Sequence, residues 1–300
     1  MQREETAPTA VHAIVVHYRS AGMVAGCVAD LLAQRGVTVS VTAVECGPDG
    51  SLDALPPTVR VLTPGRNLGY AGGNALGLAS LPEDDVPVLL VNPDVRVPST
   101  GTVRMLVDAL ALEPTLAAVA PSLLRQDGRR ESTGSTWDPG TAQALHTGAR
   151  ADRWPHVEVH VDLPWLNGAC LLLRRQAVRA IGPLDQRFFL YYEEVEWCLR
   201  AVTAGWRLRL LAECVHHAGS ASFSGSQKGA YYAVRNRHLL GRLHGRGPAW
   251  RARWVRETFR LLRRRPDQRG AALRGLRDAL LHRYGAMPGD EAVVPPGRNS

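Results

Sequence analysis

Three carboxylates lie in an otherwise aromatic and apolar stretch, which reads Phe-Phe-Leu-Tyr-Tyr-Glu-Glu-Val-Glu-Trp-Cys-Leu-Arg from Phe188 to Arg200. An acid among aromatic side chains loses water, so its pKa tends to rise towards the range in which it accepts a proton from a hydroxyl group. Glu193, Glu194 and Glu196 are therefore candidates for acid–base catalysis. Helical spacing predicts that Glu193 and Glu196 share one face, whereas Glu194 points elsewhere. The alternative is an acidic first helical turn favoured by the helix dipole.

Alternating strand and helix patterns precede this stretch and predict a mostly parallel sheet. The helical pattern spans 24–32, and strand patterns occur at 13–16, 37–44, 59–62 and 86–91. Ligands of open parallel sheets collect beyond the carboxyl ends of the strands. At this edge we expect Tyr18, Glu45, a Gly-rich turn at 67–74 and Asp94 to converge.

The second half of the chain predicts further strands and helices around the acidic stretch. In order they are a helix at 102–112, a strand at 117–120, a loop or hairpin at 126–153, a buried strand at 165–173, a short helix at 175–180 and a strand at 208–215. The last strand delivers His216 and His217 at its end. From Tyr231 onward the pattern indicates basic helices, interrupted at Gly247-Pro248 and at Pro266.

Composition limits the class of protein and the compartment. The 300 residues are 45% hydrophobic and 21% charged, as in ordinary globular proteins. The net charge of +8 is concentrated near the C-terminus, where 16 Lys and Arg residues face three acidic residues between Lys228 and Pro288. Five cysteines without a CxxC pair argue against a disulfide framework and a zinc site. With no secretory signal and no apolar run of about 20 residues, we expect a cytoplasmic protein whose membrane contact is at most peripheral.

Several segments occur in an order that is more specific than any one of them: Val15-Val16-His17-Tyr18, Val44-Glu45-Cys46-Gly47-Pro48-Asp49-Gly50-Ser51, Asn67-Leu68-Gly69-Tyr70-Ala71-Gly72-Gly73-Asn74, Val91-Asn92-Pro93-Asp94, Asn167-Gly168-Ala169, the acidic stretch and Val215-His216. Over about residues 12–240 this order resembles glycosyltransferase family 2, in particular its rhamnosyltransferase-like branch of bacterial cell-surface polysaccharide synthesis. The resemblance implies a GT-A fold, that is, a Rossmann-like, mixed and mostly parallel sheet flanked by helices. It also implies a nucleotide-diphosphate sugar donor, a divalent metal and an inverting transfer to an acceptor hydroxyl.

The donor residues are expected at the edge of the parallel sheet. Tyr18 can stack on a nucleotide base and Glu45 can accept from its N–H groups. The Gly-rich turn permits close backbone approach to a phosphate or ribose. The remaining donor candidates, from this turn and the strand end after it, are Asn67, Gly69, Gly72, Asn74 and Asn92. The turn lacks the GxxxxGK[ST] pattern of a P-loop, which disfavours NTP hydrolysis.

A metal site is expected at Asp94, the carboxylate of Asn92-Pro93-Asp94. One carboxylate can hold Mg²⁺ or Mn²⁺ when donor phosphates and water fill the other positions. The resemblance suggests His216 as a further ligand or phosphate contact, with His217 as the neighbouring alternative. A bound metal would neutralise charge on the departing diphosphate.

The resemblance assigns the general base to the second acid of the acidic stretch, which is Glu194, and Glu193 is the second candidate. Glu196 is expected to pair with Arg200 one helical turn later, in a structural role. The acceptor pocket is expected to be lined by Trp165, Asn167, Gly168 and Trp197. For both tryptophans, core packing is the competing interpretation.

The chain is expected to divide into a disordered N-terminus (1–11), a catalytic domain (12–228), a basic helical appendage (229–285) and a disordered tail (286–300). Within the catalytic domain, 12–100 would bind the nucleotide sugar and 101–228 the acceptor. Arginines of the appendage alternate with apolar residues around Trp254 and Phe259. This pattern is typical of helices on anionic membrane surfaces, so a lipid-linked or glycan acceptor and contact with the inner face of the plasma membrane are expected. A merely solvated helix face is the alternative.

Three hypotheses remain from the sequence. The first is the inverting transferase, for which dTDP-rhamnose or a UDP-sugar is the favoured donor. The second is a catalytically weak sugar-nucleotide-binding or scaffold subunit, suggested by departures from the family's usual residues at Arg19, Glu45, Cys46 and Glu194. The third is a nucleic-acid-binding protein, but basic charge without a recognition motif gives only nonspecific affinity. A nucleotidyltransferase is a weaker fourth option.

Overall fold

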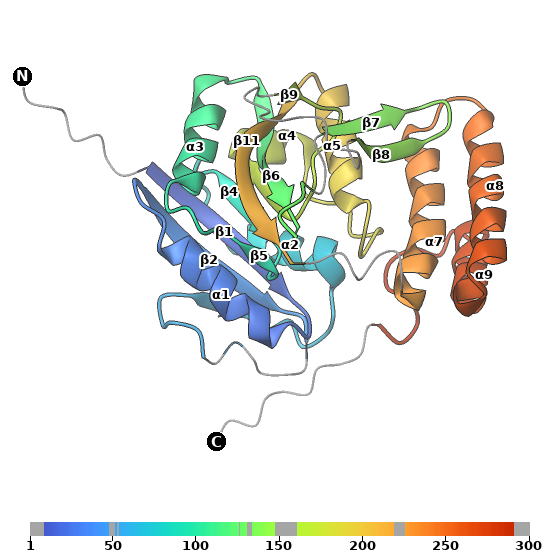
Figure 1. The fold of residues 1–300 in the computed structure, drawn as a ribbon, viewed down its shortest axis with the longest axis horizontal. Coiled ribbons are helices and arrows are strands. Elements are labelled where there is room, and N and C mark those ends of the chain that lie inside the picture. The colour runs from blue at the N-terminus through green and yellow to red at the C-terminus, as the bar shows by residue number, and fades with distance from the viewer. Residues whose placement is uncertain are drawn as a thin grey trace, which may run out of the picture.

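The computed structural model describes residues 9–47, 52, 54–125, 127–130, 134–147, 161–218 and 226–290. A nine-stranded mixed sheet crosses the middle of this part of the chain, in the order β3-β2-β1-β4-β10-β6-β11-β5, with β9 paired to β11 (Figure 1). The strands are β1 (Thr9–His17), β2 (Val37–Glu45), β3 (Arg60–Leu62), β4 (Val88–Val91), β5 (Val95–Arg96), β6 (Leu116–Leu124), β9 (Val161–Asp162), β10 (Cys170–Leu173) and β11 (Arg207–His217).

The first half of the sheet is parallel. Strand β1 pairs in parallel with β2 on one side and with β4 on the other, and β2 pairs with β3. The inner strand β1 is a nearly continuous buried run, as expected for a strand covered on both faces. The register sets His17 opposite Glu45, so the carboxyl ends of β1 and β2 lie side by side. The predicted strand and helix alternation is confirmed here.

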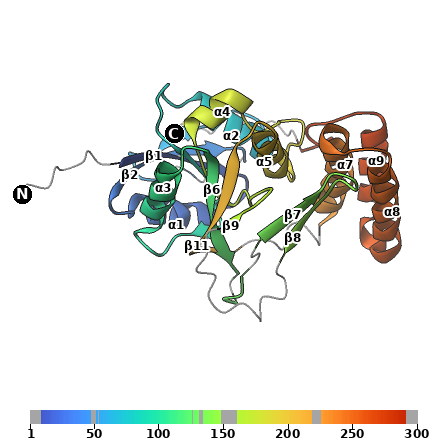
Figure 2. The same ribbon diagram turned by 90° about the horizontal axis from the view of Figure 1, so that it is seen from above.

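The second half of the sheet mixes directions. Strand β10 runs antiparallel to both β4 and β6, and β11 runs parallel to β6 with register shifts at Arg207/Leu208 and between Leu211 and Cys214. A separate hairpin of β7 (Gly134–Asp138) and β8 (Gln143–Thr147) lies within the segment predicted to be a loop or hairpin. Figure 2 shows this hairpin extending from the sheet towards α7 and α8, and the Arg246 N–H donates to the Pro139 carbonyl there.

Helices cover both faces of the sheet. Helices α1 (Ala21–Leu32) and α3 (Thr102–Leu112) pack on one face, against Val11, Ala13 and Val15 of β1. Helices α2 (Gly69–Ala79), α4 (Arg175–Ile181) and α5 (Glu193–Thr203) pack on the other, against Ile14 and Val16. The alternation of β1 side chains thus divides the interior into two apolar layers.

The Gly-rich segment is a helix, and the prediction of a turn was wrong. A Cβ on Gly73 would lie 2.6 Å from the Val16 side chain, and one on Gly77 would lie 2.6 Å from Ile14. These glycines therefore let α2 approach β1 closely. Gly69, at the start of the helix, has φ of +67°, and a Cβ there would lie 2.3 Å from the Phe189 carbonyl oxygen. Protein atoms therefore fill the space beside the backbone at these three glycines.

Three helices follow the sheet and pack on one another: α7 (Gln227–His244), α8 (Ala249–Arg264) and α9 (Arg269–Leu280). They lie side by side beyond the hairpin (Figures 1 and 2). Gly275 of α9 lies so close to α7 that a Cβ there would be 2.5 Å from the Tyr231 carbonyl oxygen. Within the described residues, no helix is both long and apolar enough to cross a membrane.

Two boundaries differ from the expected disordered ends. Strand β1 already begins at Thr9, because its first residues pair with β2. Near the other end, Asp290 is buried and accepts hydrogen bonds from the Tyr232 hydroxyl at 3.0 Å and from Lys228. Residues 9–11 and 286–290 are therefore ordered, whereas 1–8 and 291–300 lie outside the described residues.

Candidate active site

A cavity of about 520 Å³ opens at the carboxyl ends of β4 and β11. Asn92 and Asp94 line it from the end of β4, His217 from the end of β11, and Glu193 and Glu194 from the start of α5. The hairpin and the turn before β10 complete the wall, together with Arg125 and the aromatic loop before α5. The residues from these segments are Ala144, His146, Trp165, Asn167, Gly168, Ala169, Leu190, Tyr191 and Tyr192.

Glu193 and Glu194 are the two acids that share this cavity. Glu193 is only 3% exposed, and its Oε2 atom is buried with no hydrogen-bond partner. Burial raises the pKa of Glu193 well above its usual range, and the charge of Glu194 raises it further. Burial also raises the pKa of Glu194, although backbone N–H groups at the helix start oppose the rise. The two carboxyls therefore form a coupled pair, and burial raises the pKa of both.

Glu196 has a different environment, and its predicted pairing with Arg200 is confirmed. The Arg200 Nε lies 2.9 Å from both carboxylate oxygens, and His244 Nε2 lies 3.3 Å from one of them. Glu193 and Glu196 are both buried, in agreement with the shared helix face expected from their spacing, but only Glu193 lines the cavity. Because Glu193 and Glu194 open the helix directly after a left-handed residue, Tyr192, both reach the cavity while Glu196 turns inward.

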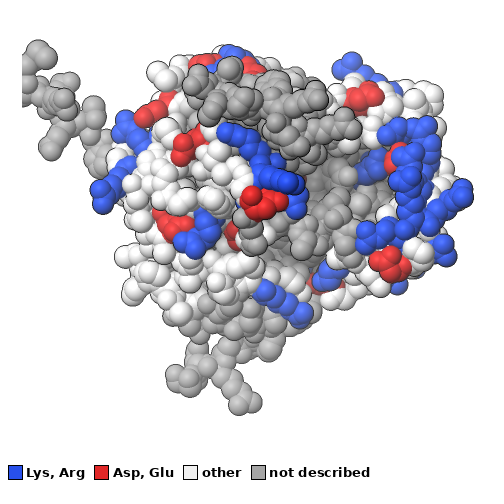
Figure 3. Space-filling model, viewed as in Figure 1, with Lys and Arg blue, Asp and Glu red and all other residues white. Residues whose placement is uncertain are grey.

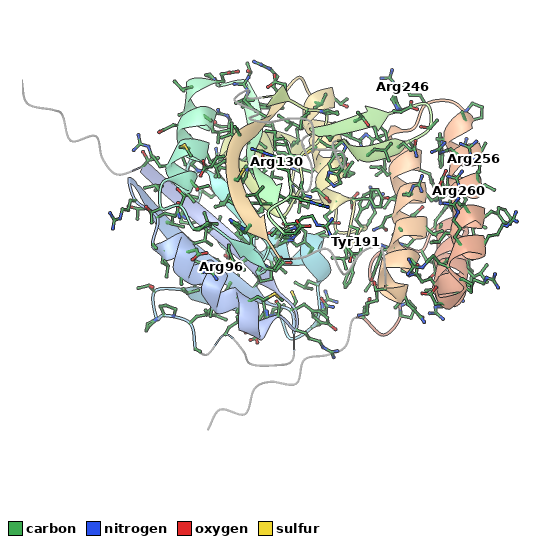
Figure 4. All side chains as sticks on the ribbon, in the orientation of Figure 1. Arg96, Arg130, Tyr191, Arg246, Arg256 and Arg260 are labelled. Carbon is green, nitrogen blue, oxygen red and sulfur yellow. The ribbon has the colours of Figure 1, made fainter. Side chains whose placement is uncertain are left out.

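The loop that delivers these acids is strained. Phe189, Tyr191 and Tyr192 have φ values of +65°, +70° and +72°, a region that residues with bulky side chains rarely adopt. Such conformations cost about 1–3 kcal/mol each and persist only where the surroundings enforce them. Three of them within four residues require an external restraint. Tyr191 lies between the sheet and α7 (Figure 4).

The restraint comes from Arg235 and Asn236 of α7, which are both fully buried. Asn236 Nδ2 donates to the carbonyl oxygens of Phe188, Leu190 and Tyr191 at 2.8–3.0 Å. The Arg235 guanidinium donates to the carbonyl oxygens of Arg187 and Phe188 at 3.1 and 2.7 Å, and to Asn236 Oδ1 at 2.9 Å. Helix α7 therefore fixes the backbone that carries the two acids.

Gly168 leaves the space in which Glu194 sits. A Cβ at Gly168 would be 3.0–3.7 Å from the Cβ, Cγ and Cδ atoms of Glu194. The Tyr70 hydroxyl fixes this turn by donating to the Gly168 carbonyl at 2.6 Å, and Asn167 Oδ1 accepts from the Ala169 N–H at 2.8 Å. The backbone beside the acids is thus held from two sides.

The two predicted tryptophans separate. Trp165 lines the cavity, and its ring contacts that of His146 with a centroid distance of 4.5 Å and an interplanar angle of 60°. Its Nε1 donates to the Thr136 carbonyl at 3.0 Å. Trp197 of α5 is fully buried in the apolar layer between the helices and the sheet, and its Nε1 donates to the Gly182 carbonyl at 2.9 Å. The expected acceptor role of Trp197 is not supported by this position, because a ligand in the cavity cannot touch it.

The histidine beside Asp94 is His217. Its Nε2 lies 3.5 Å from Asp94 Oδ2, and both side chains line the cavity. His216 is exposed and outside the cavity lining, opposite Arg96 of β5. Asp94 and His217 offer an oxygen and a nitrogen, a donor set that fits Mn²⁺ or Mg²⁺ when phosphate oxygens supply the rest. No cluster of three or more His, Cys, Asp or Glu side chains suited to a metal occurs among the described residues.

The other predicted donor residues lie outside the cavity lining. Tyr18 directly follows β1 and Glu45 is the last residue of the neighbouring strand β2, as expected. Lys228 Nζ lies 5.6 Å from the Tyr18 ring centroid. Asn67 Oδ1 accepts from the Gly69 N–H at 2.9 Å, and Asn74 Nδ2 donates to the Tyr70 carbonyl at 2.9 Å. These asparagines serve the start of α2, as does the neighbouring Gly72, whose absent Cβ would lie 2.9 Å from Leu68.

Sequence reasoning missed several residues of the cavity. Arg125, His146, Tyr191 and Tyr192 line it and were not named as site residues, and Tyr70 was quoted only within its motif. Tyr191 and Tyr192 belong to the aromatic stretch that the sequence places directly before the acids. By contrast, nothing in a mixed polar segment distinguishes Arg125 or His146, because only the hairpin and the end of β6 bring them to the cavity.

Solved structures share this fold. A mannosyltransferase from Pyrobaculum calidifontis, in complex with GDP-Man and Mn²⁺, superposes with a TM-score of 0.55 at 16% identity over 93% of this chain and 76% of its own. The S. aureus TarS fragment 1–349, in complex with UDP, gives a TM-score of 0.52 at 14% identity over 80% of this chain and 67% of its own. The fold is therefore GT-A, and the fold class expected from the sequence is confirmed.

Curated relatives agree with the fold. The N-acetylglucosaminyl-diphospho-decaprenol L-rhamnosyltransferase of Mycobacterium tuberculosis is 29% identical over 243 residues, which cover 71% of this chain and 78% of the relative. The low-salt glycan biosynthesis hexosyltransferase Agl10 of Haloferax volcanii is 28% identical over 48% of this chain and 46% of its own. No protein-family model matches the chain. Together with the fold and the cavity, these similarities define a glycosyltransferase that uses a nucleotide sugar. Among these relatives, the similarity covers most of the chain for the mycobacterial L-rhamnosyltransferase.

Proposed function

We propose that the protein transfers a sugar, with inversion, from a nucleotide-diphosphate sugar to a hydroxyl group of a lipid-linked glycan acceptor. One observation carries the proposal: two adjacent carboxylates, the buried Glu193 and the half-buried Glu194, share a cavity of about 520 Å³ with Asp94 and His217. A base for the acceptor and a cationic end for the diphosphate are the two groups that such a transfer needs.

Glu194 is the proposed general base. Its raised pKa keeps it a stronger base than an ordinary carboxylate. Burial raises the pKa of Glu193 as well, and the charge of Glu194 raises it further, so the two carboxyls form a coupled pair in which Glu194 is the proposed proton acceptor. Glu194 would accept the proton from the acceptor hydroxyl as its oxygen attacks the anomeric carbon, while the nucleoside diphosphate leaves from the opposite face.

Asp94 and His217 are the residues proposed to hold a divalent cation beside the donor diphosphate. When bound, the cation would offset the negative charge that develops on the leaving group. Mn²⁺ is favoured over Mg²⁺, because the imidazole of His217 suits the softer cation. Arg125 lines the same cavity and adds a positive charge for the phosphates.

The donor and acceptor are proposed from the relatives. The mycobacterial relative is named for rhamnosyl transfer to N-acetylglucosaminyl-diphospho-decaprenol, so dTDP-rhamnose or a UDP-sugar is the proposed donor. Tyr18 and Glu45 would bind the nucleoside at the ends of β1 and β2, and Trp165 and Asn167 would line the acceptor subsite. The reaction belongs to synthesis of a cell-wall or cell-surface polysaccharide.

A peripheral contact with an anionic membrane is proposed for α8 and α9. Phe259 is 61% exposed and Leu280 is 61% exposed, although both lie in helices rich in arginine. Lys and Arg side chains gather on the side of the molecule formed by these helices (Figure 3), where Arg256 and Arg260 project from α8 (Figure 4). Such a surface combines apolar insertion with attraction to anionic lipids.

The proposal is tested by nucleotide release. The purified protein is incubated with Mn²⁺ or Mg²⁺, a panel of dTDP-, UDP- and GDP-sugars, and a lipid-linked acceptor fraction. We expect acceptor-dependent release from one donor, its loss in Asp94→Ala and a product of inverted anomeric configuration by NMR. Tight donor binding without release from any pair would instead identify a noncatalytic sugar-nucleotide-binding subunit.

A further inference from the structure

A second cavity, of about 340 Å³, lies between α7 and α8. Arginines line it from both helices, with Arg237 on α7 and Arg260, Arg264 and Arg265 on α8 or at its end. The one acid in its lining, Glu257, already pairs with Arg253 at 3.2 Å and with Arg260 at 2.9 Å. The cavity therefore has a net positive charge.

Among the described residues, two of these four arginines form no ion pair with an acid. Within the part of the chain that the structure describes, Arg260 and Arg265 form ion pairs with Glu257 and Asp267, whereas Arg237 and Arg264 form none. Guanidinium groups in a cavity that are not paired with a carboxylate favour an anionic ligand, and their planar donors match the oxygens of a phosphate. A phosphate or diphosphate ester is the class of ligand that fits.

The floor of the cavity is apolar. Val234, Trp254 and Leu261 line it below the arginines, and the first two are buried. A free inorganic anion would gain nothing from this surface. A ligand that carries hydrocarbon next to its phosphates would bury it and gain about 25 cal/mol per Å² of apolar area. Exposed Val255 and Phe259 continue on the same helix, α8, towards the surface.

Tyr192 joins this cavity to the active site. It lines both cavities and immediately precedes Glu193 and Glu194. The charge of Arg237 acts on the Tyr192 hydroxyl, so that arginine lies close to the shared wall. A molecule with a sugar at the acids and a phosphate group at the arginines would lie across this tyrosine.

We infer that the cavity between α7 and α8 binds the phosphate groups of the lipid-linked acceptor, with Arg237 and Arg264 as the main phosphate ligands and Trp254 against the first part of the lipid. The inference rests on the proposed function, because it takes the acceptor to be a sugar ester of a lipid phosphate or diphosphate. It assigns to the basic helices a specific role in substrate recognition, beyond general attraction to a membrane.

Calorimetric binding of geranyl diphosphate, a short and soluble probe, tests the inference, with inorganic pyrophosphate and phosphatidylglycerol vesicles as separate arms. The double variant Arg237→Gln/Arg264→Gln is compared with Arg256→Gln/Arg263→Gln, a control with the same charge change on exposed residues outside the cavity lining. We expect geranyl diphosphate to bind more tightly than pyrophosphate, and the cavity variant to weaken it on the order of tenfold per arginine. The control is expected to bind the probe as the wild type does but to bind vesicles less well.

Three results would overturn the inference. Equal weakening in both double variants would mean that only general surface charge acts. Loss of probe binding in Asp94→Ala, or in the presence of excess UDP, would place the diphosphate in the donor site. Equal affinity for pyrophosphate and geranyl diphosphate would exclude a lipid ligand. None of these results depends on turnover, so nucleotide release without probe binding would leave the proposed function intact while the cavity assignment fails.

Discussion

Replacement of Asn236 by alanine should release the loop that positions Glu193 and Glu194, the proposed catalytic acids. Asn236 shares its two Nδ2 hydrogens among three carbonyl oxygens of the loop before Glu193, and its Oδ1 accepts from the Arg235 guanidinium. The variant removes all of these bonds without introducing a charge or a larger group. We therefore expect Asn236→Ala to fold, but with a loop that no longer delivers Glu193 and Glu194 correctly.

The magnitude follows from the bonds that are lost. Two buried N–H bonds are worth about 1 kcal/mol each and the bond from the guanidinium about 1.5–3 kcal/mol, so the variant should lose about 3–5 kcal/mol. That is a large part of the roughly 5–15 kcal/mol by which proteins are stable, and corresponds to a decrease in Tm of about 5–10 °C. The loss is similar to the strain of three left-handed residues, at about 1–3 kcal/mol each, so the loop should relax.

The assay is nucleotide release under saturating donor and acceptor, at a temperature where the variant is fully folded by circular dichroism. A displacement of about 1 Å at the acids is expected to lower kcat about a hundredfold. Tyr231→Phe is the matched control on α7, because it removes the hydroxyl that bonds Asp278 at 2.9 Å and touches none of the loop carbonyls. It should lower Tm and keep kcat. An Asn236→Ala protein with wild-type kcat, or an equal loss in Tyr231→Phe, would refute the claim that α7 positions the acids.

Three further predictions concern the polar groups in and around the cavity. His217→Ala should raise the Mn²⁺ concentration that half-saturates activity at least tenfold, because His217 lies beside Asp94. His216→Ala should need the same Mn²⁺ concentration as the wild type. A larger effect of His216→Ala than of His217→Ala would contradict a metal site at Asp94 and His217. Glu196→Gln should lower Tm by about 2–6 °C, because its bonds to Arg200 are weakened, and should retain most of kcat. A loss of turnover in the folded variant would show that Glu196 belongs to the active site. Because burial raises the pKa of Glu193, its ionisation opposes folding as pH rises above the ordinary value of 4.5. Urea unfolding should therefore show Glu193→Gln gaining stability relative to the wild type between acid and neutral pH, with no gain below pH 4.5; a difference independent of pH would contradict the assigned burial.

The sequence predicted the elements well where local patterns are decisive. The helix predicted at 102–112 has those bounds, the hairpin lies within the predicted segment, and the C-terminal helices break at Gly247-Pro248 and Pro266. The antiparallel direction of β10 could not be deduced, because a short buried run looks the same in either direction. The helix of the Gly-rich segment was missed because its glycines are poor helix formers, and only the closeness of β1 explains them.

The site was predicted in outline, and its errors have geometric causes. The acids, Asp94 and the turn before β10 were named from chemistry and do meet in one cavity. The resemblance suggested His216 with His217 as the alternative, and the structure places His217 beside Asp94, whereas His216 is exposed opposite Arg96. Asn236 gave no signal, because it stands between two arginines in a segment whose composition indicates a surface helix.

The most direct test of the account is the acceptor-dependent turnover of Glu194→Gln beside Glu193→Gln, measured with the donor identified for the wild type. Glutamine keeps the size of each side chain and removes its basicity. The account predicts that Glu194→Gln binds the donor with wild-type affinity and loses about 10²–10⁴-fold in kcat, while Glu193→Gln loses less. Wild-type turnover by Glu194→Gln would contradict the account, because a group other than the Glu194 carboxylate would then accept the acceptor's proton.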